Sequence, residues 1–473
     1  MKSIPPVFLF LLLAVLHSPC PVFAAEESFR FGRFGAITLY HPPAQPAAIV
    51  LFVSGDGGWN QGVVDMAREL AGLGAVVVGI DIRHYLRNLE AAGDACSYPA
   101  ADLEALSKFV QKKLGLPKYH LPMLVGYSSG ATLVYAVLVQ APPGTFAGAI
   151  SMGFCPGLPL TKPLCRGSGL DWRPGPHGKG YAFLPAQSLR TPWIVLHGVI
   201  DQVCSLEAVR PFVSAVPGAG IVALPKVGHG FSIPRNWLPQ FKTAFTRLAE
   251  QQRVISAQVP ETKLDLPIVE VPAEGPESDL LAVVLSGDGG WTGIDREIGE
   301  ALAKRGIPVA GLNSLQYFWT ARTPESTAAD LARMLRHYLG LWNKQRVILI
   351  GYSFGADVLP FAVNRLPQDL RQAVMLIALL GPAQNADFEF HVTEWLVKGT
   401  RRPTHPILPE VKKLRGSKVL CLYGEEEKDS LCRQLTPEIA DLVPLKGGHH
   451  FGGKYNMIAE KILEALPHGP GRK

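Results

Sequence analysis

An internal duplication constrains the fold of this chain more than any other feature of its sequence. Four short motifs of the first half return in the second half in the same order. The matched pairs are residues 54–59 with 286–291 (SGDGGW in both), 126–131 with 351–356, 201–204 with 429–432, and 228–231 with 448–451. Repeats at this spacing indicate two copies of one domain, which also suits the length of 473 residues.

The stretch between the two copies predicts the domain boundary. Residues 253–263 are polar and contain a proline, which is typical of an exposed linker. We therefore expect an N-terminal domain over residues 25–252, a linker over 253–263 and a C-terminal domain over 264–473.

Residues 1–24 have the layout of a secretory signal peptide. Lys2 precedes an apolar run over residues 7–16, and residues 22–24 provide a small-x-small cleavage site. The run is shorter than the roughly 20 residues of a membrane-spanning helix. We expect cleavage after Ala24 and export.

The cysteines fit an exported protein. With Cys20 in the leader, an even number remains: Cys96, Cys155, Cys165, Cys204, Cys421 and Cys432. An even set in an oxidising compartment favours disulfides. The local pair Cys421–Cys432 is the simplest pairing, and the sequence leaves the other four open.

Each half alternates strand-like and helix-like segments. In the second half the short apolar runs are 280–285, 307–312, 346–350, 373–379 and 418–423, and the segments of helical spacing are 295–305, 326–339 (with Gly340 as a stop signal) and 356–365. This alternation predicts an α/β fold with a mostly parallel, doubly wound sheet in each half. Active sites of such sheets lie at the carboxyl ends of the strands, where the repeated motifs fall.

Both halves contain a Gly-x-Ser-x-Gly motif between a strand-like and a helix-like segment. Ser128 and Ser353 are the central serines. A strand–turn–helix of this kind exposes the serine oxygen above the sheet, as in α/β-hydrolases. The context predicts two tandem α/β-hydrolase-like domains with serine nucleophiles.

A serine nucleophile needs a histidine base and an orienting carboxylate, which follow it in the order acid, then histidine. In the second half His449 is the expected base, with His450 as its neighbour. The spacing to the next cysteine favours Asp429 as the acid, whereas the distance from the preceding glycine favours Glu427. The matching residues of the first half are Asp201 and His229.

Acyl transfer also requires donors for the oxyanion that forms at the attacked carbonyl. The N–H of Phe354, next to the nucleophile, is one expected donor, and the Gly-rich turn at 286–291 supplies the other from Asp288 or Gly289. A nucleotide-binding loop is not indicated, because the turn lacks both the G-x-G-x-x-G pattern and a Walker lysine. No metal motif is present, and this chemistry needs no cofactor.

The charge balance argues against nucleic acid as a direct partner. The formal net charge of +6 is small for 473 residues and comes without a block of Lys and Arg.

The motifs together resemble the VirJ/AcvB-type bacterial virulence proteins, which are periplasmic and α/β-hydrolase-like. The resemblance lies in the two SGDGGW turns, in residues 317–325 (YFWTARTPE), in 351–357 (GYSFGAD) and in 447–451 (GGHHF). The second half is similar to the VirJ-type domain, and the duplicated whole is similar to the longer AcvB type.

The resemblance implies a periplasmic serine esterase that hydrolyses the aminoacyl ester of lysyl-phosphatidylglycerol. Its implied catalytic residues are Ser353, Asp429 and His449, and its partners an aminoacylated phospholipid at the periplasmic membrane face and secretion-system proteins. A lysyl group carries positive charge, so acidic residues near the site are expected to bind it. The substrate-binding residues we expect are Asp288, Asp357 and Trp319, with Glu325 and residues 425–427 as further acidic candidates.

Two other functions remain open at this stage. The same triad would serve a general carboxylesterase acting on soluble esters. The chain would alternatively be a non-catalytic binding or chaperone component of a secretion or DNA-transfer system, although Ser128, Asp201 and His229 complete a second catalytic set in the first half.

Overall fold

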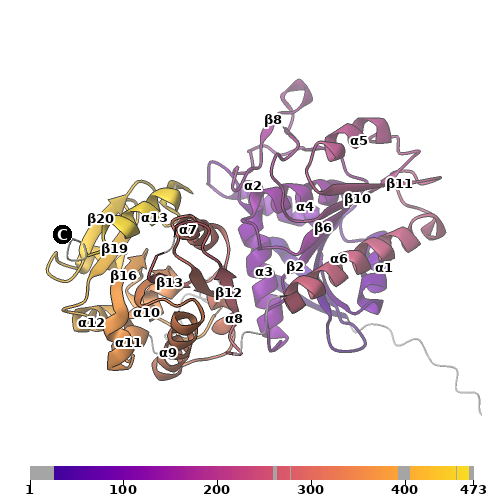
Figure 1. Cartoon of the computed structure of the whole chain (residues 1–473). Coiled ribbons are helices and arrows are strands. Elements are labelled where there is room, and N and C mark those ends of the chain that lie inside the picture. Colours follow the sequence, from indigo (N-terminus) through magenta and orange to yellow (C-terminus); the bar gives the residue numbers. More distant parts are fainter. Residues whose placement is uncertain (1–25, 259–263, 277, 392–404, 454, 468–473) are drawn as a thin grey trace, which may run out of the picture.

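The structure is a computed structural model that describes residues 26–258, 264–276, 278–391, 405–453 and 455–467, with the side chains of 255–258 excluded. The described residues form two lobes, a first lobe over 26–258 and a second lobe over 264–467 (Figure 1). The expected signal peptide lies outside the described residues.

The first lobe is built on a sheet that has, within the described residues, eight strands in the order β1-β2-β4-β3-β5-β6-β10-β11. Strands β1 and β2 run antiparallel to their neighbours and the other pairs are parallel. The strands are β1 (Glu26–Phe31), β2 (Gly35–Tyr40), β3 (Ala48–Val53), β4 (Ala75–Ile80), β5 (Met123–Tyr127), β6 (Gly148–Met152), β10 (Trp193–Gly198) and β11 (Ala219–Leu224). A small sheet of β7 (Gly157–Leu158), β9 (Tyr181–Phe183) and β8 (Trp172–Pro174) accompanies it.

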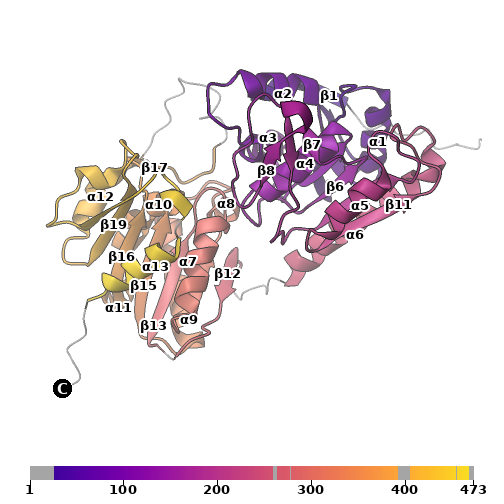
Figure 2. The same cartoon turned by 90° about the horizontal axis from the view of Figure 1, so that it is seen from above.

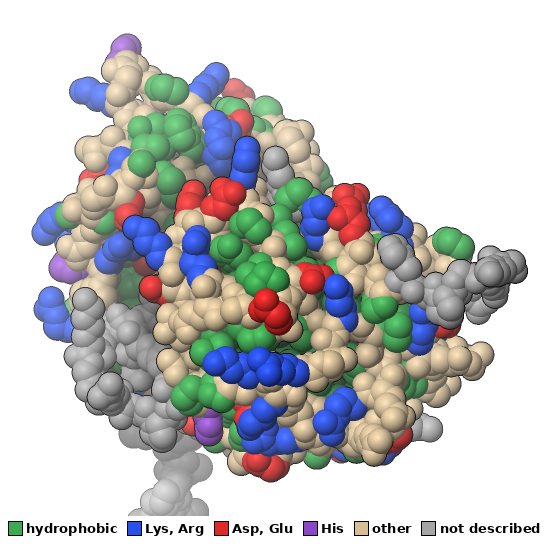
Figure 3. Space-filling view, turned by 90° about the vertical axis from the view of Figure 1, so that its left-hand side faces the viewer, with side chains coloured by type: hydrophobic (Ala, Val, Ile, Leu, Met, Phe, Trp, Pro, Cys, Tyr) green, Lys and Arg blue, Asp and Glu red, His purple; other side chains and the backbone are tan. Residues whose placement is uncertain are grey.

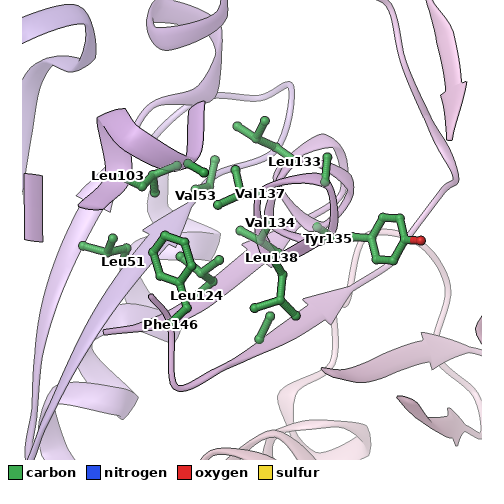
Figure 4. Packing of buried hydrophobic residues seen from close by; sticks show 14 of the residues in the cluster. Leu51, Val53, Leu103, Leu124, Leu133, Val134, Tyr135, Val137, Leu138 and Phe146 are labelled. Carbon is green, nitrogen blue, oxygen red and sulfur yellow. The ribbon is translucent and has the colours of Figure 1, made fainter. Parts of the chain in front are cut away.

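Helices cover both faces of this sheet. They are α1 (Gln61–Gly72), α2 (Ile82–Ala91), α3 (Pro99–Lys113), α4 (Ser129–Gln140), α5 (Leu206–Ser214) and α6 (Leu238–Gln258). The central strand β3 shows why two layers are needed, since its six residues are all buried. Leu51 and Val53 pack with α3 and α4 (Figure 4), whereas Val50 and Phe52 pack with α1 and α6.

The second lobe repeats this plan. Within the described residues its sheet has seven strands in the order β12-β14-β13-β15-β16-β19-β20, all parallel except β12. The strands are β12 (Ile268–Val271), β13 (Leu280–Leu285), β14 (Val309–Leu312), β15 (Arg346–Tyr352), β16 (Val374–Leu380), β19 (Val419–Gly424) and β20 (Asp441–Leu445), and β17 (Asn385–Ala386) pairs with β18 (His405–Pro406) apart from them.

Helices also flank the second sheet on both faces (Figure 2). They are α7 (Gly293–Ala303), α8 (Ser314–Tyr317), α9 (Pro324–Leu341), α10 (Phe354–Asn364), α11 (Gln368–Ala373), α12 (Ile407–Lys413) and α13 (Tyr455–Glu464). The α/β class and the doubly wound, mostly parallel sheets are therefore as expected from the sequence.

Two expected boundaries differ from the structure. Helix α6 continues to Gln258, so the expected linker at 253–263 is helical in its first part, and residues 259–263 lie outside the described residues. Gly340 lies inside α9, which ends at Leu341. A glycine near a helix end costs only about 1 kcal/mol, which the buried face of α9 offsets.

Three disulfides link cysteines within the described residues. They join Cys96 to Cys165, Cys155 to Cys204 and Cys421 to Cys432. The expected Cys421–Cys432 pair is confirmed, and the structure adds the two pairings of the first lobe.

Helix α3 of the first lobe lies at the boundary with the second lobe, close to α8 (Figures 1 and 2). An apolar cluster crosses the boundary and contains Tyr119 from the first lobe with Leu315, Trp319 and Phe390 from the second. The Trp319 indole donates to the carbonyl of Leu116 (2.7 Å), and the Gln316 amide donates to the carbonyl of Tyr119 (2.8 Å).

On the face shown in Figure 3, Lys and Arg side chains are interspersed with Asp and Glu side chains. No helix in the described part of the chain combines the length and the apolar character needed to span a bilayer.

Candidate active site

The two nucleophile turns have the same strained backbone. Ser128 follows β5 and precedes α4 with φ 55° and ψ −122°, and Ser353 follows β15 and precedes α10 with φ 49° and ψ −117°. A residue other than glycine in such a region costs on the order of 1–3 kcal/mol and is held by its surroundings.

The glycines of the motif are required by close backbone approach. A Cβ on Gly355 would overlap the carbonyl of Leu285, and a Cβ on Gly130 would overlap the carbonyl of Val53. The strand, the turn and the helix can therefore pack closely only if both positions lack a side chain.

In the second lobe Ser353, His449 and Glu427 form a connected chain of hydrogen bonds. The Ser353 Oγ lies 2.8 Å from His449 Nε2, and His449 Nδ1 lies 2.5 Å from Glu427 Oε1. All three side chains lie at the carboxyl ends of the strands, on the turns after β15, β19 and β20. The arrangement is suited to taking the serine proton onto the imidazole.

The expectation of Asp429 as the acid is not met by the geometry. Asp429 is exposed, and its backbone carbonyl accepts from the Gln384 amide (3.4 Å). Glu427 lies in the turn after β19, next to His449. The number of residues between Gly424 and the acid therefore predicts the acid correctly, whereas the number between the acid and Cys432 does not.

Hydrogen bonds keep Glu427 ionised. Burial alone would raise the pKa of its carboxyl, but the hydrogen bonds from His449 and from the N–H of Gly424 (2.7 Å) outweigh this and hold the pKa below its ordinary value. Glu427 is therefore the charged partner that an imidazolium at His449 would need.

The first lobe contains an equivalent triad. Ser128 Oγ lies 2.9 Å from His229 Nε2, and His229 Nδ1 lies 2.8 Å from Asp201 Oδ2. The N–H groups of Val203 and Cys204 donate to Asp201 Oδ1 at 2.8 and 3.1 Å. Burial would raise the pKa of Asp201, but the hydrogen bonds from His229, Cys204 and Val203 outweigh burial and lower it. The three expected residues of this lobe therefore lie together, with Asp201 ionised.

The expected oxyanion loop lies beside Ser353. A Cβ built on Gly287 would be 3.6 Å from the Ser353 Cβ, and Phe354 begins α10 directly after the nucleophile. The carbonyl of Asp288 accepts a hydrogen bond from Lys108 Nζ of the first lobe (3.1 Å). Because the peptide is planar and trans, the N–H of Gly289 points away from Lys108.

Two of the expected substrate-binding residues lie around this centre. The Asp288 side chain is exposed, so it faces solvent and not the core. Asp357 lies in the first turn of α10 and accepts from the N–H of Ala383 (2.7 Å). Burial, with a smaller contribution from Asp288, raises the pKa of Asp357 well above its ordinary value. Glu325 lies further away in α9 and pairs with Arg365 (3.0 Å).

The expectation that Trp319 meets substrate or lipid is not met. Its side chain is only 2% exposed, stacks on Phe390 and lies under Lys112 Nζ (4.8 Å from the ring centre). Trp319 packs against the first lobe because that lobe covers the end of α8. The sequence contains no direct signal of such a contact between lobes.

Two residues near the serines were not expected from the sequence. Tyr127 donates to the carbonyl of His229 (2.9 Å), and Tyr352 Oη lies 3.0 Å from His450 Nδ1. Each tyrosine therefore ties the nucleophile turn to the loop that bears the histidine. The repeated Gly-Tyr-Ser of both halves is the signal that would have identified them.

Among the described residues, no group of three or more His, Cys, Asp or Glu side chains is placed to hold a metal ion.

Several solved structures are similar to about half of the chain. The esterase domain of a Rhodothermus marinus protein is 18% identical over 48% of this chain and 98% of its own, with a TM-score of 0.33. An α/β serine hydrolase homologue from Coxiella burnetii is 18% identical over 50% and 97%, with a TM-score of 0.30. An α/β serine hydrolase without lid from Xanthomonas campestris is 20% identical over 49% and 96%, with a TM-score of 0.32.

No curated protein matches the sequence. The model of the bacterial virulence protein family VirJ matches residues 47–149 and 279–469, which together are more than half of the chain. The first region contains Ser128, and the second contains Ser353, Glu427 and His449. The chain therefore belongs to the VirJ family of bacterial virulence proteins.

Proposed function

We propose that this protein is an exported, periplasmic serine esterase that releases lysine from lysyl-phosphatidylglycerol through the second-lobe centre. The observation that carries the proposal is the hydrogen-bonded chain from Ser353 through His449 to Glu427. The choice of substrate rests on the resemblance of the motifs to the VirJ/AcvB type and on the acidic residues near these three side chains.

The reaction follows from the positions of these groups. Ser353 Oγ attacks the ester carbonyl while His449 Nε2 takes the serine proton, and ionised Glu427 stabilises the resulting imidazolium. His449 then protonates the departing glycerol oxygen, and the lysyl group stays on Ser353. Water, deprotonated by the same histidine, releases lysine and restores the serine.

Carboxylates favour the cationic acyl group. Asp288 and Asp357 are close enough that the charge of Asp288 contributes to the raised pKa of Asp357. An ammonium bound between them would offset this repulsion and favour ionised Asp357.

The test is lysine release from vesicles of phosphatidylglycerol and lysyl-phosphatidylglycerol by the mature protein, measured by amino-acid chromatography. Ser353→Ala should reduce the rate by at least about 10³-fold. Ser214→Ala, an exposed serine in α5, is the matched control. Undiminished release by Ser353→Ala would contradict the assignment.

Two outcomes would favour the other functions. Equal efficiency on a soluble lysine ester and on the lipid would favour a general carboxylesterase. Cosedimentation with the vesicles without hydrolysis of either ester would favour a binding component.

A further inference from the structure

The loop that carries the triad acid has the same backbone in both lobes. In the first lobe Val199 N donates to Leu224 O (3.0 Å) and Ile200 N to Val227 O (3.1 Å). In the second lobe Glu425 N donates to Leu445 O (2.8 Å) and Glu426 N to Gly447 O (3.1 Å). Because Asp201 and Glu427 follow at the same place, the two loops can be compared residue by residue up to the acid.

The side chains on the two loops differ in charge at every compared position. Val199 and Ile200 of the first lobe are 47% and 60% exposed, and Val203, two residues after Asp201, is 67% exposed. The counterparts of Val199 and Ile200 are Glu425 and Glu426, which are also exposed. A group of exposed apolar side chains on one loop offers a surface that suits an apolar acyl group better than a charged one.

These loops flank the catalytic histidines. A Cβ on Gly448, next to His449, would lie 3.6 Å from Glu426 Oε2. A Cβ on Gly228, next to His229, would lie 3.7 Å from the carbonyl of Ile200. The loop that carries the acid therefore lies next to the histidine in each lobe, and the exposed side chains that precede the acid are acidic in the second lobe and apolar in the first.

The positions nearer the serines show the same contrast. Asp357 is replaced in the first lobe by Thr132, whose hydroxyl donates to the carbonyl of Cys155 (2.6 Å). Asp56, the counterpart of Asp288, accepts from the Ser129 hydroxyl (2.7 Å), whereas the second lobe has Phe354 at the position of Ser129. The first centre thus has one carboxyl group fewer beside its serine.

We propose that the first lobe contains a second, independent active site that hydrolyses esters of uncharged, apolar acyl groups. The contrast with a centre for cationic acyl groups rests on the function proposed above for Ser353, while the chemistry of the first centre stands on its own triad.

Each bond change has its group in the first lobe. Ser128 Oγ bonds to the acyl carbon as its proton moves to His229 Nε2, and ionised Asp201 holds the imidazolium. The C–O bond to the alcohol then breaks, and the alcohol leaves with the proton from His229. Water gives a proton to His229 and its oxygen to the acyl carbon, and the carboxylic acid leaves as Ser128 is reprotonated.

The test compares two esters that differ by a terminal ammonium group, p-nitrophenyl hexanoate and p-nitrophenyl 6-aminohexanoate. In Ser353→Ala the remaining kcat/KM should favour the hexanoate by about tenfold or more, a range that pocket contacts typically supply. Ser128→Ala should show the opposite preference. The double variant gives the background and Ser214→Ala controls for the substitution.

Two results would overturn the proposal. If Ser353→Ala hydrolyses the hexanoate no faster than the double variant, the first lobe has no active site. If it hydrolyses both esters equally, the apolar loop does not select the acyl group. Neither result bears on lysine release by Ser353, which the vesicle assay measures separately in Ser128→Ala.

A charge exchange tests the loop itself. Val199→Glu with Ile200→Glu in the Ser353→Ala background should shift the preference toward 6-aminohexanoate by about tenfold. Val254→Glu is the matched control, because Val254 is 52% exposed and lies away from the serine. It follows Gln252 in α6, whose amide donates to the carbonyl of Leu121 just before β5, at the amino end of the strand that precedes Ser128. Unfolding temperatures should be alike, since the exchanged positions are exposed.

Discussion

At the residue scale, Glu427 shows how the position of a carboxylate within one turn decides which residue acts as the triad acid. Its carboxylate accepts from both the His449 ring and the N–H of Gly424, and this double contact fixes the direction of the ring. Asp429 is only two residues away but exposed. The two positions should therefore respond differently to loss of charge.

Glu427→Gln should lower kcat for lysine release by about 10³–10⁴-fold, because an amide favours the wrong histidine tautomer. Asp429→Asn should act on KM, through the loss of one surface charge near a cationic substrate. Steady-state kinetics on vesicles checks both. A loss of kcat in Asp429→Asn as large as in Glu427→Gln would restore Asp429 as the acid.

Asp357 gives a prediction about pH and stability. Its pKa is raised in the fold, so the folded chain holds this proton at pH values where the unfolded chain, with a pKa of about 3.9, has lost it. The resulting loss of unfolding free energy is absent below about pH 3.9 and grows as the pH rises toward the pKa of Asp357 in the folded chain. Asp357→Asn should thus raise the unfolding temperature at pH 7, with no gain below pH 3.9.

Calorimetry at both pH values checks this prediction. The same variant should bind the cationic ester less well, because the carboxylate is lost. A variant that is less stable than the natural chain at pH 7 would show that the ionised form of Asp357 is favoured in the fold.

At the scale of elements, α3 has an unusual place, since it packs on its own sheet and also supports the loop next to Ser353. Lys108 is 8% exposed, pairs with Glu104 (2.8 Å) and donates to the carbonyl of Asp288. Desolvation would lower the pKa of its ammonium, but the charges of Glu104 and Asp288 outweigh this and raise it. A charged lysine thus holds the peptide that joins Asp288 to Gly289.

Lys108→Met should lower kcat at the second centre by about tenfold with little change in KM, because the oxyanion loop loses its support. Lys113→Met is the matched control, since Lys113 lies in the same helix and pairs with Glu27 of the first lobe (2.7 Å). Hydrolysis by the second centre in Ser128→Ala is the measurement. Equal effects of the two substitutions would mean that only helix stability has changed.

The elements and nucleophile turns could be predicted because they depend on neighbouring residues. The buried run of β13 and the glycines around Ser353 are local patterns with a physical cause. The support of Asp288 by Lys108 and the burial of Trp319 could not be predicted, because both depend on how one lobe meets the other. The prediction of Asp429 in place of Glu427 failed for a related reason, since the choice depends on how far a side chain reaches across a turn.

At the scale of the whole molecule, the Cys421–Cys432 disulfide closes the loop that carries Glu427. In the first lobe Cys204, which is bonded to Cys155, also follows the triad acid Asp201 closely. Replacing both Cys421 and Cys432 by alanine should cost roughly 2–4 kcal/mol of unfolding free energy, because a short loop is no longer closed. It should also lower kcat at the second centre. Denaturant unfolding and lysine release check this, and unchanged kcat would show that the loop is held without the bridge.

The contact between lobes joins unlike surfaces, a helix of one copy against the loops of the next, and a contact of this kind can in principle add copies without end. The residues at the two free surfaces differ from those at the contact. The first-lobe counterparts of Leu315 and Trp319 are two exposed arginines, Arg83 and Arg87. On α9, Arg333 and His337 occupy the positions that Lys108 and Lys112 have on α3. Arg333 would approach Arg83 and Arg87 if one molecule docked on another in this way. Like charges therefore oppose repetition of this contact from one molecule to the next.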